Sequence, residues 1–216
     1  MPKKFVEVIK LIQKQTAGYI VPSVTKISEK KDPYQVLISC ILSLRTLDKT
    51  TFQASERLFK VADSPFAMVK LKSCILEKII YPVGFYRVKS KVILDLSKKL
   101  VRDYAGRLPA DREKLLKFKG VGRKTANLVL GLGFRIPAIC VDTHVHRITN
   151  RLGWVKTKTP EETEVALGKI IPRRWWIDLN TVLVAFGQNL CKPVSPVCSS
   201  CSVQKFCKKV NVKKSR

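Results

Sequence analysis

The sequence predicts an all-α fold, and three observations lead to that prediction. Apolar residues recur at steps of three and four over long segments, most regularly in Tyr86–Tyr104, which is the period of an amphipathic helix. A capping residue followed by proline, a typical helix start, occurs at Asp32-Pro33 and at Thr159-Pro160. No segment alternates apolar and polar residues convincingly, and no internal repeat is present. We therefore expect roughly ten helices and no sheet.

The expected helices follow one another with short breaks. The first is basic and amphipathic, with apolar positions at Phe5, Val6, Ile9 and Ile12. The segment Tyr34–Leu44, capped by Asp32, is almost wholly apolar and is expected to be buried on most sides. Asp48 is expected to cap a helix that runs to about Val61, a short helix should follow Ser64-Pro65, and two more should span Ser73–Tyr81 and Tyr86–Tyr104. In the last third of the chain, helices are expected from Asp142 to Leu152, from Thr159 to before Pro172, and from Arg173 to about Leu190. In Tyr86–Tyr104, the apolar stripe is expected at Val88, Val92, Leu96 and Leu100.

A pair of helices joined by a very short turn is expected over Leu115–Gly133. Asp111 can cap the first of them. Gly120 and Gly122 stand on either side of Val121, so the turn can adopt positive φ and bring its backbone close to a large partner.

The second helix of this hairpin opens with two cations, Arg123 and Lys124. The helix dipole disfavours a cation at that end by about 0.3–1 kcal/mol, whereas the free N–H groups there suit a phosphate. A nucleic-acid phosphate would explain Arg123. Lys124 has a second explanation, because a neutral lysine amine is a nucleophile that forms Schiff bases with carbonyl groups. The alternative is that both are ordinary solvated cations.

The charge of the chain is strongly positive. Its 42 Lys and Arg against 16 Asp and Glu give a net charge of +26, which indicates a polyanionic partner, usually a nucleic acid and alternatively an acidic membrane surface. No apolar run approaches the ~18 residues of a membrane span, and the N-terminus lacks the apolar core of a secretory signal. We expect an intracellular protein without a targeting segment, cytoplasmic or nucleoid-associated in a prokaryote, whose cysteines form no disulfide framework.

Four cysteines near the C-terminus follow the spacing C-x6-C-x2-C-x5-C. They are Cys191, Cys198, Cys201 and Cys207. Four thiolates in one short loop can enclose a metal centre, either zinc or an iron–sulfur cluster, and spacing alone leaves both open. The remaining cysteines, Cys40, Cys74 and Cys140, lie in apolar surroundings and are expected in the core.

Taken together, the Gly120–Lys124 hairpin, the segment Val141-Asp142-Thr143-His144 and the four-cysteine loop resemble the endonuclease III family of helix-hairpin-helix DNA glycosylases. The resemblance runs from about residue 30 to Cys207. It implies an all-α, two-lobed fold: a helical barrel with the helix-hairpin-helix in residues 26–135, and a lobe built from residues 1–25 and 136–216. It also implies a [4Fe–4S] cluster on the four cysteines, and DNA in the groove between the lobes.

The resemblance further implies roles for single residues. Lys124 matches the catalytic lysine of the family and Asp142 its catalytic aspartate, although an isolated Asp at that position also has a plain reading as a helix cap. Arg45 falls where relatives often carry a glutamine that fills the gap left by the extruded nucleotide, a departure that bears on opposite-base preference. Phe85 falls where a hydrophobic wedge enters the opposite strand. Contacts of the hairpin with DNA would come from Gly120, Val121, Gly122 and Arg123.

The function that the resemblance implies is that of a monomeric, bifunctional DNA glycosylase/AP lyase of base excision repair. It would remove oxidised pyrimidines from double-stranded DNA and cleave the strand at abasic sites by β-elimination through a Schiff base of Lys124. The alternatives are a monofunctional adenine-type glycosylase, which usually lacks the lysine, a non-enzymatic helix-hairpin-helix DNA-binding protein, and an iron–sulfur electron carrier, for which neither the hairpin nor the charge would be needed.

Overall fold

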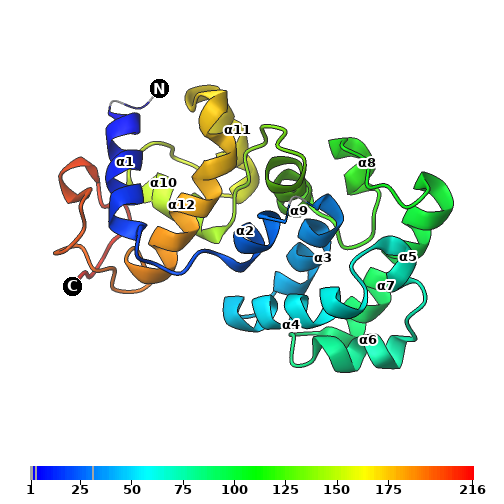
Figure 1. Cartoon of the computed structure of the whole chain (residues 1–216). Helices are drawn as coiled ribbons and strands as arrows, with labels where there is room; N and C mark the ends of the chain where they lie inside the picture. The colour runs from blue at the N-terminus through cyan, green and yellow to red at the C-terminus, as the bar shows by residue number, and fades with distance from the viewer. Residues whose placement is uncertain (1, 3, 31) are drawn as a thin grey trace. The chain divides into compact units, whose positions relative to one another are not determined.

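The computed structural model describes residues 2, 4–30 and 32–216, and in that part of the chain every regular element is helical (Figure 1). The predicted all-α class is therefore confirmed. None of the helices in the described part is both long and apolar enough to cross a bilayer. The chain divides into two compact units, Ser23–Ile136 and the combination of Met1–Pro22 with Pro137–Arg216.

The unit Ser23–Ile136 is built around α3. Its helices are α2 (Ser23–Ser28), α3 (Pro33–Ser43), α4 (Asp48–Val61), α5 (Pro65–Met68), α6 (Ser73–Ile80), α7 (Tyr86–Tyr104), α8 (Arg112–Leu116) and α9 (Arg123–Leu128), which continues as a π-helical segment over Val129–Gly133. Helices α2, α4, α7 and α9 all pack on α3. Every residue of α3 from Tyr34 to Leu42 is buried, which confirms the burial expected from its apolar sequence.

Helix starts in this unit follow the sequence signals with one correction. The Asp32 carboxylate accepts hydrogen bonds from the backbone N–H of Tyr34 at 2.8 Å and caps α3 as predicted. Asp48 was expected to cap α4, but the cap position belongs to Leu47. The Asp48 carboxylate instead accepts bonds from the N–H of Ser23 at 2.9 Å and from its hydroxyl at 2.8 Å. It thereby anchors α2, a short helix that the sequence did not predict.

The long helix α7 corrects a second expectation. Val88 was assigned to the buried stripe but is 61% exposed, while the neighbouring Lys89 is buried. The inward face continues through Ile93, Leu96 and Leu100. Lys89 lies four residues before Ile93 and therefore on the same, inward face of α7. The sequence pattern had placed Val88 on that face instead.

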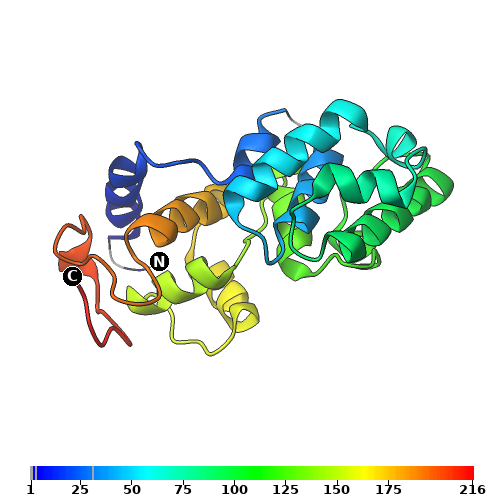
Figure 2. The same ribbon diagram turned by 90° about the horizontal axis from the view of Figure 1, so that it is seen from below.

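The unit formed by both ends of the chain contains α1 (Phe5–Thr16), α10 (Thr143–Arg151), α11 (Pro160–Ile170) and α12 (Trp176–Asn189), with short 3₁₀ turns at Arg173–Trp175 and Gln204–Phe206. Helices α1 and α12, from opposite ends of the chain, lie side by side (Figures 1 and 2). Their contact buries the apolar face of α1 in a core shared with α10 and α12, which includes Phe5, Ile12, Ile148, Leu183 and Phe186. The last long helix was expected from Arg173, but the 3₁₀ turn comes first and α12 begins at Trp176.

Candidate DNA-repair site

The helix-hairpin-helix consists of α8, a tight turn and α9. Asp111 caps α8 by accepting a hydrogen bond from the N–H of Lys114 at 2.8 Å. Of the two turn glycines only Gly120 has positive φ, at 83°, whereas Gly122 is extended at φ −94° and forms the N-cap of α9. The buried side chain of Val121 fixes the turn between them. A Cβ on Gly122 would meet no atom within 4 Å, so its backbone faces open space.

Lys124 is the second residue of α9, and its side chain and that of Arg123 are exposed, while the helix behind them is buried from Thr125 onward. The lysine lies near Cys40 of α3. Burial raises the pKa of the Cys40 thiol to about 12, and the positive charge of Lys124 acts in the opposite direction. The thiol stays protonated at neutral pH, so this neighbour of Lys124 carries no charge.

Arg45 and Phe85 come together on the surface of the same unit. Both have left-handed backbone, with φ of 52° and 57°, and the Arg45 guanidinium lies 5.7 Å from the centre of the Phe85 ring. A hollow of about 400 Å³ is lined by both residues, by Val88 and Val92 of α7 and by Gly120 of the hairpin. Segments expected to contact DNA, far apart in the sequence, thus meet around one hollow.

Asp142 belongs to the unit that contains α10, whereas Lys124 belongs to Ser23–Ile136. It is the N-cap of α10, where its Oδ1 atom accepts hydrogen bonds from the N–H groups of His144 and Val145, both at 2.9 Å. The cap uses one carboxylate oxygen and leaves Oδ2 outside it. Asp142 therefore has a structural role in this unit, whatever its role in chemistry.

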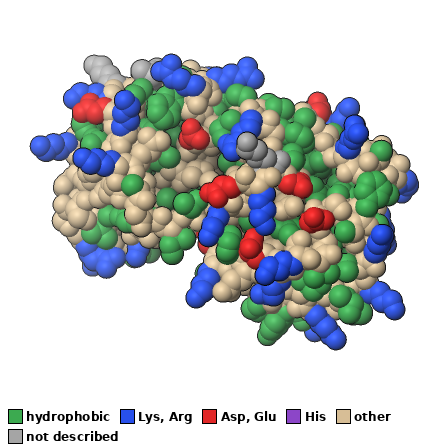
Figure 3. Space-filling view, in the orientation of Figure 1, with side chains coloured by type: hydrophobic (Ala, Val, Ile, Leu, Met, Phe, Trp, Pro, Cys, Tyr) green, Lys and Arg blue, Asp and Glu red, His purple; other side chains and the backbone are tan. Residues whose placement is uncertain are grey.

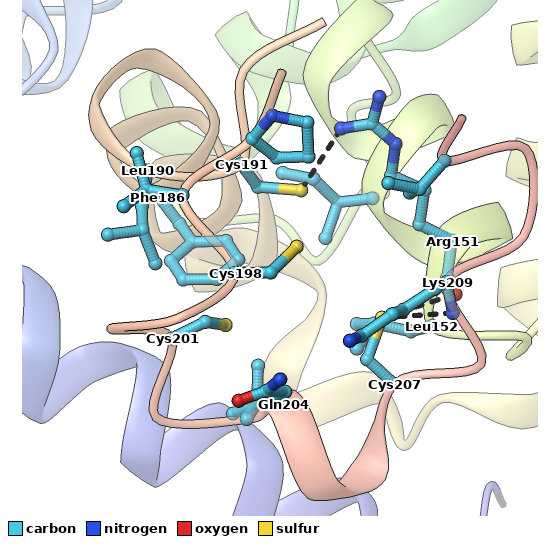
Figure 4. Close-up of a pocket in the computed structure, with 15 residues that line it drawn as sticks. Arg151, Leu152, Phe186, Leu190, Cys191, Cys198, Cys201, Gln204, Cys207 and Lys209 are labelled. Atoms are coloured by element: carbon cyan, nitrogen blue, oxygen red, sulfur yellow. Dashed lines mark hydrogen bonds between the residues drawn. The ribbon is translucent and has the colours of Figure 1, made fainter. Parts of the chain in front are cut away.

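The four clustered cysteines line one cavity near the C-terminus (Figure 4). They are Cys191, Cys198, Cys201 and Cys207. The Arg151 guanidinium donates to the sulfur of Cys191 at 3.4 Å, and the backbone N–H of Lys209 donates to that of Cys207 at 3.4 Å. Burial raises the pKa of Cys201 to about 11, and it also raises the pKa of Cys207.

A donor set made only of cysteine thiols suits an iron–sulfur cluster or zinc, so the residues present fit such a group. Within residues 2, 4–30 and 32–216, no three or more His, Cys, Asp or Glu side chains are grouped closely enough to ligate one metal ion.

Of the other cysteines, Cys40 and Cys140 are buried as expected, but Cys74 is exposed on α6, so the prediction that it belongs to the core was wrong.

Comparisons with known proteins agree with this site. Residues 38–173 match the model of the HhH-GPD superfamily base excision DNA repair proteins. Endonuclease III of Thermotoga maritima is 48% identical over 193 residues, which cover 89% of this chain and 91% of that protein. The chain belongs to the endonuclease III family. Endonuclease III-like protein 1 of Gallus gallus is 45% identical over 81% of this chain and 63% of its own length.

Solved endonuclease III structures show the same fold. A non-covalent endonuclease III–DNA complex has a TM-score of 0.84 and 32% identity, and covers 97% of this chain and 96% of its own. A trapped endonuclease III–DNA covalent intermediate has a TM-score of 0.83 at 32% identity, with the same coverage. As a member of the endonuclease III family, the protein is a DNA glycosylase/AP lyase of base excision repair, and the predicted class of enzyme is confirmed.

One buried residue of this endonuclease III fold escaped the sequence analysis. The Lys89 ammonium donates hydrogen bonds to the carbonyl oxygens of Leu42 and Leu44 and to the hydroxyl of Thr46. Its burial could have been read from the sequence, because Lys89 falls on the same helix face as Ile93. A lysine on an apolar face is normally expected to reach out to solvent, and so the signal was not used.

Proposed function

We propose that this protein binds damaged double-stranded DNA as a monomer, extrudes the damaged nucleotide and removes oxidised pyrimidines with Lys124 as the nucleophile. The observation that carries the proposal is the position of Lys124, exposed at the start of α9 directly after the glycine turn. The similar structure of a trapped endonuclease III–DNA covalent intermediate supports a covalent route. The large excess of Lys and Arg over Asp and Glu, visible on the face in Figure 3, suits a phosphate backbone.

A base inside a duplex is out of reach, so the target nucleotide must be turned out of the helix at a cost of a few kcal/mol. Arg45 and Phe85 would hold the resulting gap open, with Arg45 in the vacated position and Phe85 as a wedge in the opposite strand. Their common hollow beside Gly120 supports this assignment. The extended backbone of Gly122 and the N-terminal end of α9 would face a phosphate of the strand.

The chemistry divides between Lys124 and Asp142. Breaking the glycosidic bond develops positive charge on the sugar, which the Asp142 carboxylate would stabilise, as carboxylates do in glycoside hydrolysis. The neutral amine of Lys124 attacks C1′ and the base leaves with the bonding electrons. The aminal opens to a protonated Schiff base, which accepts the electron pair released when C2′ loses a proton. The 3′ phosphate then departs by β-elimination.

The four cysteines would hold a [4Fe–4S] cluster, with each thiolate as a ligand. When bound, the cluster would cross-link the C-terminal loop, which otherwise has little regular structure beyond the turn Gln204–Phe206. The protein's own contribution is to keep the loop against α10. Arg151 donates to the carbonyls of Lys192 and Pro193, both at 2.7 Å, and fixes the chain that follows the first ligand.

Borohydride trapping tests the proposal. Wild type, Lys124→Ala and Lys114→Ala are incubated with two duplexes, one with an abasic site and one with an oxidised pyrimidine. Lys114 is exposed on α8 and serves as the matched control. We expect adducts from wild type and from Lys114→Ala on both duplexes, and none from Lys124→Ala. An adduct from Lys124→Ala equal to that of wild type would overturn the assignment of the nucleophile, and an adduct with the abasic duplex alone would overturn the proposed base specificity.

A further inference from the structure

Lys89 is one of two buried cations in the described part of the chain, with the residue only 6% exposed, the other being Arg151 at 7%. Its ammonium donates to the Leu42 carbonyl at 2.8 Å, to the Leu44 carbonyl at 2.5 Å and to the Thr46 hydroxyl at 3.0 Å. All three N–H donors are thereby used. The acceptors belong to the end of α3 and the turn that follows it, so one side chain of α7 ties down the whole turn that carries Arg45.

The same turn also touches the start of α7. The Thr46 hydroxyl accepts a hydrogen bond from the N–H of Gly84 at 3.2 Å. A Cβ on Gly84 would lie 2.5 Å from the carbonyl oxygen of Arg45, so the two backbones are in direct contact. Lys89 itself donates its backbone N–H to the carbonyl of Phe85 at 3.0 Å. That backbone bond is the first helical bond of α7 and would form with any residue at position 89, so the contribution of the lysine itself is the hold of its side chain on the Arg45 turn.

Both turns need such support. Arg45 and Phe85 have φ of 52° and 57°, in the left-handed region that non-glycine residues rarely occupy. Residues in that region keep their conformation only when surrounding contacts impose it. The exposed side chains themselves supply little, since Phe85 is 60% exposed. Each turn is closed by a backbone hydrogen bond, from the N–H of Thr46 to the Ser43 carbonyl at 3.2 Å and from the N–H of Tyr86 to the Val83 carbonyl at 3.1 Å. The contacts that join the two turns come from Lys89, Thr46 and the Gly84 backbone.

We propose that Lys89 is a positioning residue, whose buried ammonium locks the Arg45 turn to the Phe85 turn so that both side chains enter the duplex in a fixed relative arrangement. The inference rests on the proposed roles of Arg45 and Phe85 in holding open the gap left by the extruded nucleotide. Lys89 also lines the hollow between Arg45 and Phe85, but its three donors are bonded to the turn after α3, so it acts through the two turns.

The electrostatic setting supports the assignment. Burial lowers the pKa of Lys89 to about 8, which means that the protein holds a cation where desolvation disfavours it. The compensation comes from the last carbonyls of α3, where the helix dipole favours positive charge. An apolar side chain would fill the same space without the desolvation, but it could not hold the carbonyls of Leu42 and Leu44.

Comparing reaction rates on duplex and single-stranded substrates distinguishes a positioning role of Lys89 from a role in stabilising the fold. An abasic site in a single strand has no opposite strand and no gap to fill, so it requires Lys124 but not the two turns. The variants are Lys89→Met, which keeps side-chain volume without the donors, and Thr46→Val, which removes only the bridging hydroxyl. Lys98→Met, exposed on the same helix, is the matched control. Arg45→Ala and the double variant Arg45→Ala/Lys89→Met complete the set.

We expect Lys89→Met to lower the single-turnover rate on an oxidised-pyrimidine duplex about tenfold or more, the scale of a lost charge-assisted hydrogen bond. Thr46→Val should show a smaller loss in the same direction. On the single-stranded abasic substrate both should stay within about twofold of wild type, as should Lys98→Met on both substrates. The double variant should be no slower than the slower of its two parents, because both act through the same turn.

Two results would overturn the inference. Equal losses on the duplex and on the single strand would make Lys89 a support of the fold only, and so would losses that add up in the double variant. If Lys89→Met does not fold, the same comparison is made with Thr46→Val, and unchanged duplex activity in that variant also overturns the inference. Failure of the proposed function looks different, because Lys124→Ala would then keep its activity on both substrates.

Discussion

Asp142 offers the sharpest test of the proposed chemistry, because the structure gives it a second role that must be separated from the first. Its Oδ1 atom caps α10 through two hydrogen bonds of 2.9 Å. Replacing an N-cap Asp by Ala costs about 0.5–2 kcal/mol, while Asn caps about equally well. Loss of the negative charge at the helix start costs a further ~0.3–1 kcal/mol. Asp142→Asn should therefore lose only the charge contribution, about 0.3–1 kcal/mol, and Asp142→Ala should lose about 1–3 kcal/mol.

Catalysis should rank the variants differently. Both remove the carboxylate charge that would face the developing positive charge on the sugar, so both should lower the single-turnover rate of base removal about 100-fold or more, as loss of one stabilising group in an active site does. The control is Thr159→Ala, which removes the cap of α11 in the same unit. It should lose stability on the same scale as Asp142→Ala and keep its rate.

The measurements are urea unfolding followed by helical circular dichroism, and single-turnover cleavage of an oxidised-pyrimidine duplex. The decisive comparison is between Asp142→Asn and wild type. If the Asn variant removes the base within about twofold of the wild-type rate, the carboxylate charge does not serve the reaction, and Asp142 is a helix cap only.

Three further predictions concern the glycines, Lys89 and the cysteine loop. Gly84→Ala should lower the free energy of unfolding by about 1–3 kcal/mol, because its Cβ would lie 2.5 Å from the backbone carbonyl oxygen of Arg45. Gly122→Ala is the contrasting variant: its Cβ would have no atom within 4 Å, so it should unfold like wild type but bind duplex DNA more weakly in a titration at fixed salt. Burial lowers the pKa of Lys89 from 10.5 to about 8, so the unfolded chain binds the proton more tightly and the free energy of unfolding should rise from pH 8 to pH 10.5. Urea unfolding at pH 7.5, 9 and 10 should show this rise in wild type relative to Lys89→Met, and a free energy that changes equally with pH in both proteins would refute it. Cys198→Ser should lose iron by elemental analysis and unfold at lower urea, and an iron-free variant that folds and cuts like wild type would disprove a structural role for the cluster.

Local signals predicted much of the fold. The caps at Asp32, Asp111, Asp142 and Thr159 all accept the expected backbone hydrogen bonds, because capping depends on residues two or three positions away. The same holds for the hairpin turn, whose glycine with positive φ is Gly120. These features involve neighbours in the sequence, so a reading of the sequence can find them.

Features that depend on distant partners could not be predicted in this way. Asp48 has the composition of a cap, but it bonds to Ser23, 25 residues earlier. Helix α2 has only Val24 and Ile27 as buried apolar residues, too few to show a period. Val88 and Lys89 exchange the positions that hydropathy assigns to them, because the acceptors for a buried ammonium come from the end of α3.

The candidate site depends both on local sequence signals and on contacts between residues far apart in the sequence. Lys124 depends on the start of its own helix, which the sequence shows directly. Arg45 and Phe85 were identified only through the resemblance to the endonuclease III family, as two residues in separate turns. Their guanidinium and ring lie 5.7 Å apart, next to the backbone contact at Gly84 and the buried ammonium of Lys89, and neither of these neighbours is revealed by periodicity.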